Sequence, residues 1–174
     1  AARVAQDTRI NLSGLVMVSP MLKIQMKPVA RLLVQAGATL MPGLRIRLNR
    51  EGVDGLTNED IFRAMLRDEQ NRTARGVTLS FLKAYFREQK RFRRNIDALR
   101  KVPVFLMVAG NENFIDPVKV EEMMNLVMKG HHDYTLKRYN EGLHSLLFDE
   151  KRDEYVSDII SWLKKIDPGK NPKK

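Results

Sequence analysis

One histidine lies in a loop whose place in the chain suits it for acid–base chemistry. His144 occurs in Gly142-Leu143-His144-Ser145, between the last predicted strand and the amphipathic pattern of the last predicted helix. Such a loop places an imidazole at the carboxyl edge of a parallel sheet, where open α/β folds bind ligands. Because histidine exchanges protons near neutral pH, His144 is a candidate general base for a serine nucleophile. A surface or structural role for a single histidine is the alternative.

Two carboxylates follow the preceding apolar stretch and are candidates to orient that imidazole. Asp116 stands before Pro117 and a helical pattern, so the N-cap of that helix is its alternative role. Glu112 is a further candidate acid. Ser19 follows the first predicted strand, at the carboxyl edge of the same sheet, and cannot serve as an acid.

Several other chemistries lack the residues that they need. The chain has no cysteine, which excludes disulfides, thiolate zinc sites and cysteine nucleophiles. The two other histidines, His131 and His132, lie beside Gly130 and Asp133 in a polar turn, and we expect solvent rather than a metal around them. The sequence therefore predicts neither a metal nor a cofactor.

The composition indicates one globular domain with a basic surface. The chain has 174 residues, of which 43% are apolar and 30% charged, and its formal net charge is +10. No apolar run approaches the roughly 18 residues of a membrane span. We expect a cytoplasmic location because no signal peptide is present. The opening letters AARVAQD resemble the end of a helix.

Three apolar stretches predict the strands of a parallel sheet. They cover residues 15–18, 102–109 and 134–139, and the first two end at Ser19-Pro20 and Gly110. Helical patterns follow the second and third strands, over residues 118–128 and 155–166. Strand and helix alternate as in an α/β fold, but three strands are too few to bury both faces of such a sheet. The chain therefore resembles the second half of a domain.

The segment between the first two strands, residues 21–100, predicts a helical insertion. Helical patterns cover residues 29–36, 58–67 and 78–89, joined by turns that contain glycine and proline, and no strand is expected there. The short tail, residues 169–174, is expected to fray.

Three stretches of the sequence are similar to one known superfamily. They are LSGLVMVSPMLKI, VPVFLMVAGNENFIDP and YTLKRYNEGLHSLLFDEKRDEYVSDIISWLKK. The chain resembles α/β-hydrolases, in the branch of monoacylglycerol lipases, lysophospholipases and serine aminopeptidases. The resemblance implies the carboxyl-terminal part of an α/β-hydrolase fold. Residues 1–20 would hold a helix end and the first strand, residues 21–100 the cap, and residues 101–168 the remaining core.

The resemblance also implies the roles of site residues. In this family a serine on a G-x-S-x-G turn, an acid and a histidine act together. His144 matches the histidine, and Asn113 stands where the family has its aspartate, which leaves Asp116 as a possible charged substitute. No two glycines are four positions apart, so the serine turn lies outside this chain.

The implied function is hydrolysis of carboxylic esters, with a lipid such as a monoacylglycerol or lysophospholipid as substrate. The serine would come from the missing amino-terminal half of the domain, which makes that half a partner of this chain. A catalytically impaired relative that acts as a binding module is the alternative, because Asn113 carries no charge.

Two groups of residues in the insertion indicate which ligands or surfaces the chain could bind. An acyl-chain pocket or ordinary packing would explain the apolar residues Met21, Leu22, Met26, Leu32, Leu33, Leu40 and Met41. The insertion also contains a basic run: Arg87, Lys90, Arg91, Arg93, Arg94, Arg100 and Lys101. The first interpretation of this run is a solvent-exposed face of the cap. Docking on an anionic membrane is the second interpretation of that run, and nucleic-acid binding is not favoured.

Overall fold

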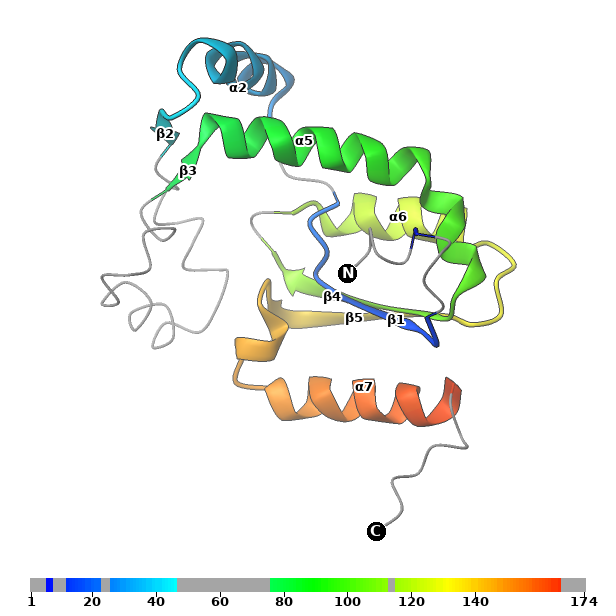
Figure 1. Cartoon of the computed structure of the whole chain (residues 1–174). Coiled ribbons are helices and arrows are strands. Elements are labelled where there is room, and N and C mark those ends of the chain that lie inside the picture. The colour runs from blue at the N-terminus through cyan, green and yellow to red at the C-terminus, as the bar shows by residue number, and fades with distance from the viewer. Residues whose placement is uncertain (1–5, 8–11, 23–25, 47–75, 113–114, 167–174) are drawn as a thin grey trace.

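A three-stranded parallel sheet lies between helices on its two faces (Figure 1). The computed structural model describes residues 6–7, 12–22, 26–46, 76–112 and 115–166. The strands are β1 (Leu15–Val18), β4 (Val104–Asn111) and β5 (Tyr134–Leu143), in the order β1-β4-β5. β4 pairs in parallel with both neighbours. The three predicted strands and their parallel arrangement are confirmed.

The central strand β4 supplies side chains to a core on each face of the sheet. Its alternate residues face opposite sides because successive side chains of a strand point in opposite directions. Val104, Leu106 and Val108 join one apolar cluster. Phe105, Met107 and Ala109 join the other. Burial on both faces explains why this strand is a continuous apolar run in the sequence.

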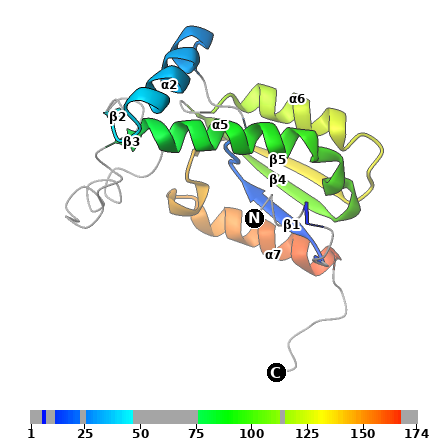
Figure 2. The ribbon, with the colours of Figure 1, turned by 45° about the horizontal axis from the view of Figure 1, so that its top comes forward.

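A different set of helices covers each face (Figure 2). Helix α6 (Pro117–Val127) buries Val120 and Met124 in the cluster that contains Val104. Helix α7 (Arg152–Ile166) lies on the opposite face, where Trp162 stacks on Phe105 with 5.7 Å between ring centroids. No helix in the described part of the chain is long and apolar enough to cross a membrane.

Within the described residues, the cap consists mainly of two helices that pack on each other, α2 (Pro28–Leu40) and α5 (Leu79–Arg94). Their shared apolar cluster contains Val34 and Ala38 of α2 and Leu79, Leu82 and Phe86 of α5. The hydroxyl of Thr78 accepts a hydrogen bond from the backbone N–H of Phe81 and caps α5. A 3₁₀-helix, η2 (Ile96–Lys101), then leads from the cap into β4.

The cap differs from the prediction in one respect, because it contains a short antiparallel strand pair. β2 (Arg45–Ile46) pairs with β3 (Val77–Thr78), so the expectation that the insertion has no strand is wrong. Strands of two residues are too short to show an alternating pattern in the sequence. Both described helices of the cap also extend beyond their predicted ends.

Some expectations fall on parts of the chain that the structure does not describe. The helix predicted over residues 58–67, the tail at residues 169–174 and residues 1–5 of the helix end expected over residues 1–7 lie outside the described residues. Gln6 is described, and its side-chain amide donates hydrogen bonds to the carbonyl oxygens of Phe92 and Asn95 near the end of α5.

Candidate functional site

His144 is the first residue after β5, at the carboxyl edge of the sheet. The loop that carries it leads into a 3₁₀-helix, η3 (Leu146–Phe148), and then into α7. One oxygen of Asp149 accepts a hydrogen bond from the N–H of Leu143 at 3.0 Å, and the other accepts one from the N–H of Lys151 at 3.0 Å. The backbone on both sides of His144 is therefore fixed by hydrogen bonds, and its imidazole is 16% exposed.

A buried carboxylate contacts the imidazole of His144. Glu112 is the first residue after β4, and its Oε2 lies 2.5 Å from Nδ1 of His144. The side chain of Glu112 is only 2% exposed. Its Oε1 accepts a hydrogen bond from the backbone N–H of Ile115 at 3.2 Å. A carboxylate at Nδ1 holds the proton of a neutral imidazole on that nitrogen, which makes Nε2 the basic one.

The strand register explains why these two residues meet. Asn111 at the end of β4 pairs with Leu143 at the end of β5, so the next residues of the two strands are Glu112 and His144. The register shifts just before this pair, between Ala109 and Asn111. Gly110 lies in that irregularity, and a Cβ atom there would be 2.5 Å from the backbone Cα and O of Asn140. The close approach of the two backbones therefore requires glycine at this position.

The other sequence-predicted acid, Asp116, caps helix α6. Its Oδ1 accepts a hydrogen bond from the N–H of Lys119 at 3.1 Å, and its Oδ2 lies 3.3 Å from Nζ of Lys119. Pro117 occupies the first turn of the helix, as the sequence indicates. The carboxylate at Nδ1 of His144 thus comes from Glu112, and Asp116 has the capping role. Asn113 lies outside the described residues.

His131 and His132 lie in the turn that leads into β5. Nε2 of His131 lies 2.7 Å from the carbonyl oxygen of Arg100, and its Nδ1 accepts a hydrogen bond from the N–H of Asp133. His131 is partly exposed and His132 is exposed. Within the described residues, no three His, Cys, Asp or Glu side chains are grouped so that they could hold a metal ion.

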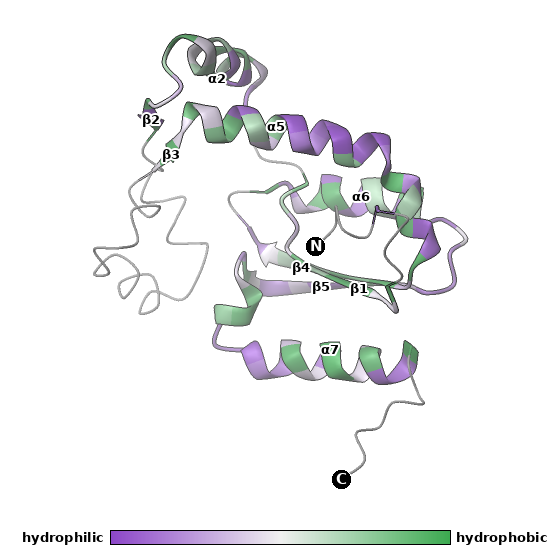
Figure 3. Ribbon diagram, viewed as in Figure 1, coloured by the Kyte–Doolittle hydropathy of each residue, from purple (hydrophilic) through white to green (hydrophobic). Residues whose placement is uncertain are grey.

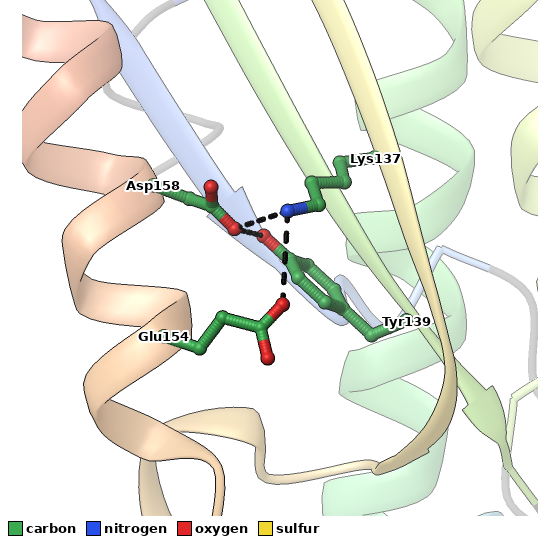
Figure 4. Close-up of polar contacts among 4 residues, drawn as sticks. All are labelled: Lys137, Tyr139, Glu154 and Asp158. Carbon is green, nitrogen blue, oxygen red and sulfur yellow. Dashed lines mark hydrogen bonds and ion pairs between the residues drawn. The ribbon is translucent and has the colours of Figure 1, made fainter.

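A polar network ties β5, the strand before His144, to helix α7 (Figure 4). Oδ2 of Asp158 lies 2.6 Å from Nζ of Lys137 and accepts a hydrogen bond from the hydroxyl of Tyr139 at 2.7 Å. Glu154 lies on the other side of the Lys137 ammonium, at 3.9 Å. Burial raises the pKa of Asp158, but the hydrogen bonds from Lys137 and Tyr139 outweigh it and leave that pKa below its usual value. Burial, together with Asp158, raises the pKa of the Tyr139 hydroxyl.

The apolar residues that were candidates for an acyl pocket divide into two groups. Leu22 is buried in the core, where Met21 also packs, and Met26 packs against the cluster between α2 and α5. The other four are exposed side chains of the cap: Leu32, Leu33, Leu40 and Met41. Ordinary packing, one of the two interpretations of these residues, therefore describes Met21, Leu22 and Met26.

The basic run forms an exposed surface. Figure 3 shows the carboxyl-terminal half of α5 as largely hydrophilic. Several of its cations contact neighbouring oxygens. Arg87 and Arg91 pair with Glu88 at 3.9 Å and 2.7 Å. Arg93 donates to the carbonyl of Leu22, and Arg100 donates to the carbonyls of Val127 and Lys129 at the end of α6. This arrangement agrees with a solvated outer face of the cap.

The fold is similar to those of two solved lipases. The monoacylglycerol lipase of Paleococcus ferrophilus matches with a TM-score of 0.74 and 20% sequence identity, over 95% of this chain and 63% of the lipase. A soluble variant of monoglyceride lipase from Saccharomyces cerevisiae, in complex with a substrate analog, matches with a TM-score of 0.71 and 19% identity, over 95% of this chain and 58% of the lipase. This chain thus spans less than two thirds of either lipase.

Sequence comparison places the chain in a family. No curated protein is significantly similar to it in sequence. The family of serine aminopeptidases S33, which are α/β-hydrolases, matches residues 1–151. Because this match covers most of the chain, and because the sheet and its flanking helices have the same arrangement as in α/β-hydrolase lipases, the chain belongs to the serine aminopeptidase family S33 of the α/β-hydrolases.

Proposed function

We propose that this chain provides the base and the acid of a serine hydrolase that cleaves carboxylic esters. The observation that carries the proposal is the buried carboxylate of Glu112 at 2.5 Å from Nδ1 of His144. In this proposal His144 is the base and Glu112, rather than Asn113 or Asp116, is the acid. The serine and the oxyanion-hole donors come from sequence outside these 174 residues.

The arrangement of the pair suits each step of acyl transfer. Nε2 of His144 accepts the proton of the serine hydroxyl as that oxygen attacks the ester carbonyl. The imidazolium that forms is stabilised by the negative charge of Glu112, which is screened little because the carboxylate is buried. His144 then protonates the departing alcohol, and water releases the acyl group by the same steps.

A lipid ester, such as a monoacylglycerol, is the substrate class that we favour. Both solved relatives are described as monoacylglycerol or monoglyceride lipases. The exposed leucines of α2 offer an apolar surface on the cap that favours contact with lipid. The charged Glu112 beside His144 makes the alternative, an impaired relative that only binds, the less favoured function.

The proposal is tested in the full-length protein that contains this chain. Wild-type protein should hydrolyse short p-nitrophenyl esters and monoacylglycerols, and a fluorophosphonate should label a serine outside these 174 residues. His144→Ala should abolish turnover and labelling, whereas the turn variant His132→Ala should retain both. Turnover of His144→Ala within about tenfold of wild type would reject His144 as the base, since loss of a triad base costs far more.

A second candidate function is docking of the cap on an anionic membrane surface. Leu32, Leu33 and Leu40 of α2 are 67%, 66% and 82% exposed, and exposed cations follow along α5. A cap that carries both exposed apolar and exposed basic side chains suits binding at an anionic lipid interface.

Vesicle sedimentation tests this second function. The protein should bind vesicles of phosphatidylcholine and phosphatidylserine, bind phosphatidylcholine alone more weakly, and lose binding at high salt. Leu33→Ser should weaken binding, and Leu126→Ser, at an equally exposed position on α6, should not. Equal binding of wild type and Leu33→Ser would reject docking through α2.

A further inference from the structure

Ser19, at the end of β1, combines three features that its packing does not explain. Its φ is 39°, in the left-handed region that non-glycine residues rarely adopt. The residue is 7% exposed, and its Oγ has no hydrogen-bond partner. Its backbone N–H donates to the carbonyl of Met107 at 2.9 Å, so the backbone is anchored to β4. A buried hydroxyl without a partner in a strained backbone indicates a functional constraint.

The surroundings of Ser19 include the proposed catalytic acid. Ser19 and Glu112 line the same small cavity, together with apolar residues: Pro20, Val108, Ala109, Ile115, Pro117 and Val120. About 10 Å³ of the cavity can be occupied by the centre of a water molecule. That space is about what a single water requires, and it is too small for an acyl chain.

We propose that one water molecule occupies this cavity and bridges the hydroxyl of Ser19 and the carboxylate of Glu112, which makes Ser19 a positioning residue for the Glu112–His144 pair. A buried water is stable where at least two polar groups can bind it, and Ser19 and Glu112 are the two residues with polar side chains that line this cavity. A carboxylate accepts about four hydrogen bonds, so a water donor is compatible with the contacts to His144 and Ile115.

The water has two effects on the pair. It fixes the carboxylate of Glu112 in the orientation that faces Nδ1 of His144. A further hydrogen-bond donor also favours the ionised carboxylate. The hydroxyl of Ser19 orients the water, and the left-handed backbone is the conformation that directs the hydroxyl into the cavity.

Two substitutions separate the hydroxyl from the backbone conformation. Ser19→Ala and Ser19→Gly both remove the hydroxyl, but glycine adopts a positive φ without strain. Ser157→Ala, which removes an exposed hydroxyl on α7, is the matched control. The proposal predicts that the alanine and glycine variants behave alike and differ from the control.

Two measurements do not depend on catalysis. A high-resolution crystal structure should contain an ordered water within hydrogen-bond distance of Ser19 Oγ and a Glu112 oxygen. NMR of the His144 Nδ1 proton should give a resonance that both Ser19 variants shift and Ser157→Ala does not. An empty cavity, or an unshifted resonance in Ser19→Gly, would overturn the proposal even if the protein is an esterase.

A third measurement rests on the proposed function and uses the full-length protein. In both Ser19 variants kcat should fall about tenfold or more, as expected for a misplaced catalytic group, while KM stays within about twofold. Wild-type kinetics in Ser19→Gly would overturn the inference. Absence of activity in the wild type would instead reject the proposed function. In that case the crystal structure and the NMR measurement still decide the role of Ser19.

Discussion

Asn111 of β4 pairs with Leu143 of β5, although Ala109, two residues before Asn111, pairs with Tyr139, four residues before Leu143. β5 therefore contains two more residues than β4 between these pairs, which is a bulge. Had the earlier register continued, Glu112 would align with Gly142. The bulge moves the alignment along β5 until Glu112 lies beside His144, so a local irregularity of the sheet forms the candidate acid–base pair.

The first prediction concerns the identity of the acid. Glu112→Gln should lower kcat of the full-length enzyme by up to about 10⁴-fold, because an amide neither stabilises the imidazolium nor holds the correct tautomer. The side chain keeps its size, so the free energy of unfolding should change little in comparison. Steady-state kinetics and denaturant unfolding measure the two quantities.

The position that the family pattern favours provides the control for this prediction. If Glu112 is the acid, Asn113→Asp alone should change kcat by less than about threefold, since the imidazole already has a carboxylate partner. A large gain in kcat from Asn113→Asp, with no loss from Glu112→Gln, would instead assign the acid to position 113.

The second prediction concerns the bulge itself. In Gly110→Ala the new Cβ would lie 2.5 Å from backbone atoms of Asn140, so the two strands must separate. Overpacking of this kind costs about 1–3 kcal/mol, and displacement of Glu112 from His144 should lower kcat as well. Gly43→Ala is the matched control, because a Cβ at position 43 has no atom within 4 Å. Similar stability and kcat in both variants would show that the close approach at Gly110 is not required.

The third prediction separates the capping role of Asp116 from a catalytic one. Asp116→Ala should lower the free energy of unfolding by about 1 kcal/mol, and Asp116→Asn should retain most of it because asparagine is an equally good N-cap. The asparagine variant should also retain wild-type kcat. A loss of kcat in Asp116→Asn comparable to that in Glu112→Gln would show that Asp116 acts in catalysis.

The sequence was sufficient to predict the sheet, because its signals are local and strong. The run from Val104 to Ala109 is apolar throughout, and burial on both faces of the sheet requires that pattern. Asp116-Pro117 marks the start of α6 through capping chemistry that involves only neighbouring residues. His144 was located by the loop between the last strand and the last helix.

The partner of His144 could not be selected from the sequence for a physical reason. The family resemblance favours Asn113, with Asp116 as a charged substitute. The contact, however, depends on the alignment of two strands, and the bulge changes that alignment. Asn140 and Glu141, which lie in the bulge, are polar and exposed and therefore look like a loop. The predicted strand accordingly ended at Tyr139, four residues before the end of β5. Gly110, adjacent to the bulge, was the one available signal, because glycine at a strand end often marks a close backbone approach.

The last prediction uses the network that joins β5 to α7. The pKa of Asp158 is lower in the folded chain than its usual value of 3.8, because Lys137 and Tyr139 donate hydrogen bonds to the carboxylate and outweigh the effect of its burial. A carboxylate with a depressed folded-state pKa stabilises the fold at pH values above the unfolded-state pKa. That stabilisation is lost as the pH falls through the folded-state pKa and the group becomes protonated in both states.

Asp158→Asn should therefore destabilise the full chain by a constant amount at neutral and weakly acidic pH. The difference between wild type and variant should shrink below about pH 4. Urea unfolding at a series of pH values measures this difference. Asp153→Asn is the control. Asp153 lies on the same helix, and its side chain is 92% exposed. Within the described residues, its carboxylate pairs with the exposed neighbour Arg152. A difference between wild type and Asp158→Asn that stays constant from neutral pH to pH 2 would show that the charge of Asp158 does not stabilise the contact between β5 and α7.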